Sequence, residues 1–214
     1  MTGPQARVTA VCVVHAVVPG YFHDTAIDKR PRPGAVRVEA TGLVGDEQRD
    51  RGHGGPDAAV YVYADEDAAF FADVLGRELP PGLFGENVRT TGLDVCGARI
   101  GERWLVGDVL LEVRKPRTPC PNLAMHVGVT DFHRVFHRSG RVGAMCRVLR
   151  AGTLAAGRQV VVESVPGHGV TVADLSAGLT PDQAASLLGS GVPLAAPVRG
   201  RAQRVLARSR RDSP

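Results

Sequence analysis

The chain has 214 residues, 43% of them hydrophobic and 22% charged, which is typical of a globular protein long enough to bury a full hydrophobic core. No apolar stretch is long enough to cross a bilayer, so we expect no membrane span. The net charge of +4 comes mainly from the last segment, RGRAQRVLARSRRDSP, which argues against a nucleic-acid-binding domain. Four cysteines without a CxxC pair argue against a zinc knot or disulfide scaffold and favour a reducing, cytoplasmic location.

Short β-branched runs dominate the first part of the chain. They predict strands at residues 7–18, 35–40 and 59–63, because each run is bounded by glycine, proline or charged turns. The run VTAVCVVHAVV could also pass for the core of a signal peptide. It lacks a basic leader, so we interpret it as the first strand.

Residues 65–76, DEDAAFFADVLG, predict a helix of about three turns. Acidic residues fill the first turn, where the partial positive charge of a helix N-terminus favours them. An apolar stripe of Phe70, Phe71, Val74 and Leu75 follows, and a glycine ends the segment.

The middle of the chain returns to short strands. We expect them around ARI, WLV and VLLEVRKP and then, after a short helix at DFHRVFHR, at GAMCRVLRAG and RQVVVESV. Many short strands and few helices predict a mainly β fold, a β-barrel with a few peripheral helices.

The last part of the chain changes to a helical pattern. In TPDQAASLLG, Thr180 is the expected N-cap, Pro181 takes the first helical position and Gln183 completes a capping box. Helices are also expected at TVADLSAGL and at RGRAQRVLARSRR, the latter with a frayed end. The sequence therefore predicts a β-barrel domain at residues 1–169 and a small C-terminal helical extension at residues 170–214.

Two glycine-containing loops follow the early strands. In GLVGDEQRDRGHGGPDAAVYVY, residues 42–63, glycines let backbone N–H groups approach an anion, and Arg49, Arg51 and His53 add donors and charge. This stretch predicts either an anion cradle or a long flexible loop. In FGEN, the amide of Asn87 can donate and accept hydrogen bonds, although the motif alone favours a simple turn.

The segment KPRTPCPNLA holds a thiol between two prolines. Pro119 and Pro121 fix the backbone around Cys120, so the sulfur is presented on a stiff turn at a strand end. A thiolate is both a soft metal ligand and a nucleophile, and Arg117 would favour the ionised form. A lone cysteine is also often structural, so both interpretations stay open.

The other candidate ligands give weaker signals. Cys12 and Cys146 lie in apolar strands and are expected to fill the core, whereas Cys96 lies in a loop and is undecided. His133 and His137 have the i, i+4 spacing that can hold a metal, but the glutamate of a HExxH site is missing. We therefore expect no metal at these histidines.

The sequence contains, in this order, the stretches GLVGDEQ, HGGPDAAVYVY, FGEN followed by TTGL, IGERW and PRTPC. Taken together, these stretches resemble the stand-alone, YiiM-type members of the MOSC family. The name MOSC denotes the C-terminal domain of molybdenum cofactor sulfurases. The resemblance implies a MOSC-type β-barrel that binds the molybdenum cofactor, molybdopterin, with Cys120 as the metal ligand.

The resemblance also implies which residues form the pocket. His53 is the candidate proton donor and, with Cys120, a candidate catalytic residue. No iron–sulfur or flavin signature is visible, so electrons would come from a separate reductase. The residues implied to hold pterin and phosphate are Arg117, Thr118, Gly54, Gly55 and Asn87.

Related enzymes reduce N-hydroxylated compounds, and the YiiM-type group is associated with detoxifying 6-N-hydroxylaminopurine. The resemblance thus implies a molybdenum-dependent oxidoreductase acting on a small N-hydroxylated substrate. Two alternatives stay open, because Cys120 could carry a persulfide in sulfur transfer, or the protein could be a non-enzymatic cofactor carrier. No membrane or nucleic-acid partner is expected, and a homodimer is left open.

Overall fold

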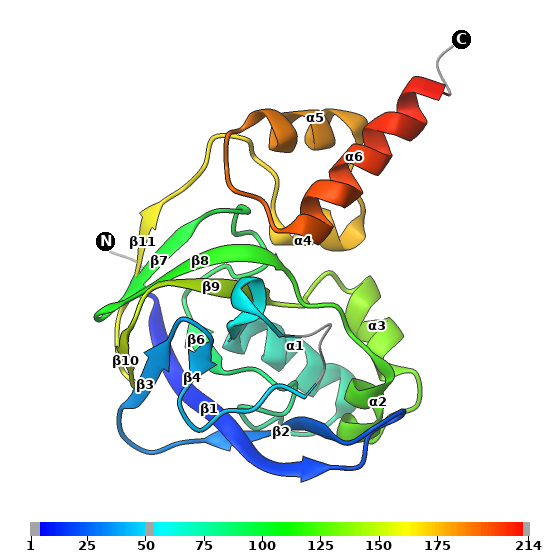
Figure 1. Cartoon of the computed structure of the whole chain (residues 1–214). Coiled ribbons are helices and arrows are strands. Elements are labelled where there is room, and N and C mark those ends of the chain that lie inside the picture. Colours follow the sequence, from blue (N-terminus) through cyan, green and yellow to red (C-terminus); the bar gives the residue numbers. More distant parts are fainter. Residues whose placement is uncertain (1–4, 50–53, 212–214) are drawn as a thin grey trace.

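The computed structural model describes residues 5–49 and 54–211, and over these residues the fold is mixed and sheet-dominant, with several helices (Figure 1). The strands are β1 (Arg7–Val18), β2 (Thr25–Pro31), β3 (Val36–Glu39), β4 (Gly42–Leu43), β5 (Val60–Ala64), β6 (Val88–Thr91), β7 (Arg103–Val106), β8 (Val109–Pro116), β9 (Ala144–Arg150), β10 (Gly152–Leu154) and β11 (Val160–Ser164). The helices are the 3-10 helix η1 (Pro56–Ala58), α1 (Asp65–Leu75), α2 (Pro121–Val127), α3 (Phe132–Arg138), α4 (Val172–Ala177), α5 (Pro181–Gly189) and α6 (Ala196–Arg211).

Most strands in the described part of the chain belong to one eight-stranded sheet, in the order β11-β7-β8-β9-β5-β6-β1-β2. Neighbouring strands are antiparallel except β5 and β6, which run parallel. Parallel neighbours need a crossover connection, and α1 provides it between these two strands. β10, β3 and β4 form a second, small sheet.

The expected closed barrel is not confirmed, because the large sheet has two edges, β11 and β2. The start of β1 approaches the chain before β11 through one isolated bridge between Arg7 and Gln159. A hydrogen bond from the Val8 backbone N–H to the Arg158 carbonyl oxygen, at 2.8 Å, supports this contact. From Cys12 onward, β1 pairs with β2 instead. The first strand therefore changes partner before a continuous ladder with β11 can form.

A cluster of buried aromatic rings packs α1 and α3 against the sheet. The ring centroids of Phe71 on α1 and Phe136 on α3 lie 5.0 Å apart, and Phe84 lies 5.1 Å from Phe136. Tyr63 of β5 stacks on Phe136 at 5.7 Å. Such pairs contribute beyond the apolar area that they bury. The cluster fixes α3, which contacts the neighbouring α2, and α2 in turn contacts β2.

Several local predictions are confirmed. The three early strands and the helix after them are β1, β3, β5 and α1, and the short helix at DFHRVFHR is α3. The apolar stripe of α1 is only partly buried, because Phe71 is fully buried but Phe70 and Val74 are 40% and 54% exposed. The segment ARI forms no strand. The sequence did not predict β2 or α2, and these two elements border Cys120.

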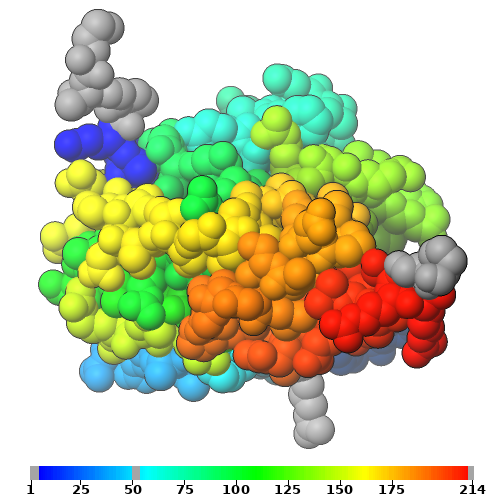
Figure 2. All heavy atoms as spheres, turned by 90° about the horizontal axis from the view of Figure 1, so that it is seen from above, coloured from blue at the N-terminus to red at the C-terminus, as the bar shows by residue number. Residues whose placement is uncertain are grey.

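Helices α4, α5 and α6 form the C-terminal part of the described chain, and α5 and α6 lie together on one face in Figure 2. The capping box between Thr180 and Gln183 is present at the start of α5, as predicted. Val198 and Ala202 of α6 are buried. No helix in residues 5–49 or 54–211 has the length and apolarity needed to span a bilayer. The division of the chain at residue 170 stays a prediction, and the expected frayed end falls partly on residues 212–214, outside the described residues.

Candidate functional site

Cys120 lies on a turn between a strand and a helix. β8 ends at Pro116, and α2 begins at Pro121, whose fixed φ and missing N–H suit the first helical position. Cys120 directly precedes the helix in an extended conformation, with φ −130° and ψ 168°, and its thiol makes no capping hydrogen bond. The side chain is partly exposed. The prolines around the thiol therefore both stiffen the turn and start a helix.

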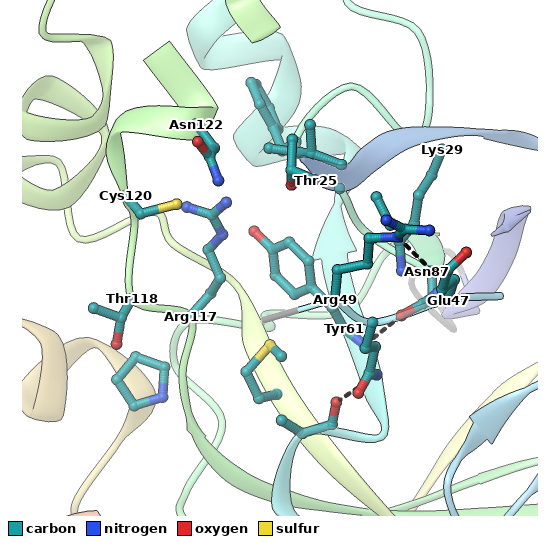
Figure 3. Close-up of a pocket in the computed structure, with 18 of the residues that line it drawn as sticks. Thr25, Lys29, Glu47, Arg49, Tyr61, Asn87, Arg117, Thr118, Cys120 and Asn122 are labelled. Carbon is teal, nitrogen blue, oxygen red and sulfur yellow. Dashed lines mark hydrogen bonds and ion pairs between the residues drawn. The ribbon is translucent and has the colours of Figure 1, made fainter. Parts of the chain in front are cut away.

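Segments that are far apart in the sequence line a cleft around Cys120 (Figure 3). They are β2, residues 47–49, residues 84–87 and residues 115–122, together with Ala58 of η1, Tyr61 of β5 and Met145 of β9. The cleft has a volume of about 120 Å³. Tertiary structure, rather than any one motif, therefore builds this site.

The cleft carries an excess of positive charge. Lys29, Arg49, Lys115 and Arg117 line it together with the carboxylate of Glu47. The Nε of Arg49 donates to Oε1 of Glu47 at 2.6 Å, so these two charges compensate each other. Neither Lys115 nor Arg117 forms an ion pair with another residue in the described part of the chain.

Arg117 has a buried donor that the described residues do not use. Its guanidinium carbon lies 5.9 Å from the ring centroids of both Tyr61 and Phe136. Its Nη1 is buried and has no hydrogen-bond partner among the described residues. An unsatisfied buried donor costs about 1–3 kcal/mol, and more when it is charged. Phosphate or carboxylate oxygens would satisfy such a donor, so these residues fit an anionic ligand.

A buried network positions Lys29 at the cleft. Lys29 is 8% exposed, and its Nζ lies 2.5 Å from Oδ2 of Asp46. The same oxygen accepts from Nδ2 of Asn87 at 2.8 Å, and Oδ1 of Asp46 accepts from the backbone N–H of Val14 at 2.9 Å. Because an ammonium group has three donors, Lys29 can keep Asp46 and still donate toward the cleft.

The amide of Asn87 is already engaged. Besides its bond to Asp46, Nδ2 donates to the carbonyl oxygen of Cys12 at 3.3 Å, and Oδ1 accepts from the backbone N–H of Tyr61 at 3.1 Å. Asn87 is 1% exposed. Both amide hydrogens therefore have protein acceptors, and the side chain positions Asp46 and β5 rather than offering a free donor.

The structure brings together several of the predicted site residues at this cleft, namely Cys120, Arg117, Thr118 and Asn87. The predicted glycines do not line it. Gly54 packs on the cleft residue Gln48, since a Cβ added to it would lie 2.5 Å from Oε1 of Gln48. Gly55 precedes η1 with φ 90°, a conformation that favours glycine. His53, the predicted proton donor, lies outside the described residues.

Two groups of cleft residues were not predicted from the sequence. Four residues of β2 line the cleft, namely Thr25, Ala26, Ile27 and Lys29. The β-branched residues of TAIDKRP were the available signal, but aspartate, lysine and proline weaken it as a strand pattern. Asn122 is the second case, because only the unpredicted helix α2 turns its amide toward the thiol, as Figure 3 shows.

The other cysteines are buried. Cys12 and Cys146 fill the core, as expected. Burial raises the pKa of Cys12 to about 12. Cys96, left undecided by the sequence, is also buried, and burial together with the carboxylate of Asp67 raises its pKa to about 12. Within residues 5–49 and 54–211, no group of three or more His, Cys, Asp or Glu side chains could hold a metal ion.

Comparison with known proteins identifies relatives over most of the chain. The family model for the MOSC domain matches residues 49–161. The uncharacterized protein YflK of Bacillus subtilis is 35% identical over 150 residues, which is 70% of this chain and 68% of YflK. Protein YiiM of Escherichia coli is 33% identical over 140 residues, 62% of this chain and 61% of YiiM. A protein named reductase from Gibberella moniliformis is 36% identical over 140 residues, 62% of this chain but only 24% of that protein.

A solved structure has the same fold. The crystal structure of YiiM from Geobacillus stearothermophilus matches with a TM-score of 0.77 at 22% identity, and the match covers 94% of this chain and 99% of that one. The family model spans more than half of the sequence, and the matched segment covers more than two thirds of YflK. Like the stand-alone proteins YflK and YiiM, the chain therefore belongs to the MOSC domain family.

Proposed function

We propose that the protein binds the molybdenum cofactor in the cleft around Cys120 and reduces N-hydroxylated compounds to amines, with electrons from a separate reductase. Family membership supports cofactor binding, because MOSC domains are generally associated with this cofactor. The shared segment of the Gibberella moniliformis reductase supports oxidoreductase chemistry. From the resemblance to YiiM-type proteins, 6-N-hydroxylaminopurine is the substrate that we would test first.

One observation carries the proposal: the partly exposed thiol of Cys120 shares a cleft with the half-buried Arg117, whose buried Nη1 has no hydrogen-bond partner among the described residues. Cys120 offers the soft sulfur that molybdenum accepts. Arg117 offers donors in a geometry suited to phosphate, and Lys115 adds charge at the same cleft. This donor set fits an anionic pterin cofactor with a thiol-bound metal.

Each cleft residue has an assigned part in the proposal. Cys120 would ligate the metal, while Arg117 and Lys29 would neutralise the phosphate and Thr118 would donate a hydrogen bond to the pterin. When bound, the cofactor supplies two-electron redox chemistry at molybdenum. Gly54 would act indirectly, by letting Gln48 pack closely beside it at the cleft, and Gly55 by adopting the positive φ that precedes η1.

The reaction also needs protons. Breaking the N–O bond of an N-hydroxyl group takes up two electrons and two protons and releases the amine and water. Tyr61 is a poor proton donor, because its hydroxyl donates to the carbonyl oxygen of Val142 at 2.8 Å and burial raises its pKa well above the usual value. His53 remains the predicted donor.

Metal and pterin analysis tests the proposal directly. Protein made in a host that synthesises the cofactor should hold stoichiometric molybdenum and pterin, and with a reducing system it should convert 6-N-hydroxylaminopurine to adenine. Arg117→Gln should lose most of the pterin, whereas the matched control Arg138→Gln, at an exposed position of α3 outside the cleft, should keep it. Folded wild-type protein without molybdenum from that host would refute the proposal.

A second candidate function rests on the accessibility of the thiol. Because Cys120 is partly exposed and its thiol does not cap α2, it could carry a persulfide and pass the sulfur to an acceptor. Metal-free protein bearing one labile sulfur per chain, lost in Cys120→Ser, would favour this function over the reductase.

A further inference from the structure

A second cavity adjoins the Cys120 cleft. It has a volume of about 220 Å³ and shares three lining residues with the cleft, Thr25, Ile27 and Asn122. Its remaining walls come from the end of β1 and from α2, through Val18 and Met125 among others. A small molecule in this cavity would therefore lie next to the cleft that holds Cys120.

The two cavities differ in charge. Lysine and arginine side chains line the cleft, whereas no Asp, Glu, Lys or Arg of the described residues lines the second cavity. Four of its lining residues are apolar, namely Val18, Pro19, Ile27 and Met125, and the others are the uncharged Thr25 and Asn122 together with His126. A phosphate or carboxylate would lose its hydration there without gaining a counter-charge, which is strongly unfavourable. The cavity therefore favours an uncharged molecule.

Two of the polar side chains that line this cavity have unused hydrogen-bonding atoms. Asn122 and His126 are four residues apart on α2 and so share one helix face. Oδ1 of Asn122 accepts from the backbone N–H of Tyr21 at 2.7 Å, but Nδ2 makes no hydrogen bond within the described part of the chain.

His126 is half-buried, and its ring likewise makes no hydrogen bond to the described residues. Burial lowers the pKa of His126, against the opposing effect of Asp28, so the ring is mainly neutral at neutral pH. A neutral imidazole has one donor and one acceptor nitrogen. Together with Nδ2 of Asn122, it can bind both donors and acceptors on the edge of a heterocycle.

We propose that the second cavity is the substrate subsite of the cleft and that it selects a small uncharged heterocycle, such as a free nucleobase, over the phosphorylated nucleotide. Its volume is below that of pockets for drug-sized ligands, which fits a single ring system. The apolar walls contact the ring, and Asn122 and His126 bind its polar edge. The inference rests on the proposed function and names Met125 and His126 as residues that determine specificity.

Equilibrium binding to the purified protein tests the subsite without turnover. Adenine and 6-N-hydroxylaminopurine should bind at least about tenfold more tightly than adenosine 5′-monophosphate. Met125→Trp, which adds bulk to the cavity wall, should weaken binding of both bases by about tenfold or more. The matched control Val135→Trp adds a similar bulk at an exposed position of α3 that lines neither cavity, so it should bind the bases normally.

A second variant removes chemistry rather than space. His126→Phe keeps a ring but loses both nitrogen atoms, so it should also weaken base binding by about tenfold. The subsite is overturned if wild-type protein binds neither base, if the monophosphate binds as tightly as adenine, or if both variants bind the bases normally.

Molybdenum analysis of the same preparations separates this inference from the proposed function. If the protein holds molybdenum but both substitutions leave the affinity for the bases unchanged, the proposed subsite is refuted and cofactor binding is supported. If base binding depends on Met125 and His126 but no molybdenum is held, the cavity binds bases and the proposed reductase function fails.

Discussion

Two arginines three residues apart have opposite surroundings. Arg114, inside β8, is 2% exposed, and its Nε donates to Oδ1 of Asp57 at 2.7 Å. Its Nη1 donates to Oε1 of Glu112 at 2.6 Å and to the carbonyl oxygen of Pro193. Arg117, just beyond the strand, has a buried Nη1 without a partner among the described residues. The first guanidinium holds the fold together, whereas the second keeps donors that a ligand can use.

The same contrast holds for the regions around the two arginines. Asp57 also accepts from Nη2 of Arg147 at 2.7 Å, so the charges near Arg114 are compensated within the protein, and Pro193 ties that network to the chain before α6. Further along the same segment, Lys115 and Arg117 line the cleft without a carboxylate partner in residues 5–49 and 54–211. Charge compensation therefore distinguishes the structural end of this segment from the candidate binding end.

The largest expected effect comes from removing the thiol at the binding end. Cys120→Ser should abolish reduction of 6-N-hydroxylaminopurine and molybdenum retention, because a serine hydroxyl is harder and far less acidic than a thiol. The free energy of unfolding should change by less than about 0.5 kcal/mol, since the thiol makes no capping bond and the prolines set the turn. Activity, metal content and urea unfolding of the same preparation measure this.

Cys146→Ser is the control for that prediction. It buries a hydroxyl at a fully buried core position and should lower stability by about 1–3 kcal/mol while the folded fraction keeps its molybdenum. If Cys120→Ser retains most of the activity and folded Cys146→Ser loses it, the wrong thiol has been assigned.

The next largest effect compares the two arginines directly. Arg114→Met should destabilise the fold by about 3–5 kcal/mol, because it leaves the buried carboxylate of Glu112 without this partner. Arg117→Met should change the unfolding free energy by no more than about 1 kcal/mol, because no ion pair is broken, but it should lower cofactor content. Urea unfolding gives both values. Equal destabilisation by the two substitutions would show that Arg117 is structural as well.

Features with local causes were predictable from the sequence. The helix at residues 65–76 and the capping box of α5 depend on residues within one or two turns, and both are present. The cleft depends on distant contacts: Lys29 faces it through Asp46 and Asn87, and these three residues come from different segments. Pairing with β1 also places β2 at an edge of the large sheet, and the spacing of residues in the sequence does not reveal this position. Cys120 and Arg117 were therefore predictable from the sequence as site residues, whereas the place of Lys29 at the cleft and the open edges of the large sheet were not.

A truncation tests whether the structural end extends into α6. Removing the residues after Pro197 deletes the buried side chains of Val198 and Ala202 and the hydrogen bond from Arg201 to the carbonyl oxygen of Leu175, but it keeps the contact of Pro193 with Arg114. We expect a loss of about 2–3 kcal/mol with the cleft and its cofactor content intact. Loss of all folded protein would mean that α6 belongs to the core, against a division of the chain at residue 170.

The smallest effect extends the comparison from arginines to thiols and depends on pH. The Cys12 thiol stays protonated in the fold up to about pH 12, because burial raises its pKa, whereas in the unfolded chain it ionises near 9.0. Between these pH values the unfolded state binds fewer protons, so the free energy of unfolding falls as pH rises.

Cys12→Ala should lower the free energy of unfolding by about 1 kcal/mol at pH 7 and make its decline between pH 8 and about 10.5 shallower. Cys96 has a similar shift, so part of the decline should remain. Urea unfolding of wild type and Cys12→Ala at both pH values measures the difference. An identical slope in wild type and Cys12→Ala would mean that the Cys12 thiol can ionise in the folded state, and the distinction between a buried structural thiol and an accessible one would then fail.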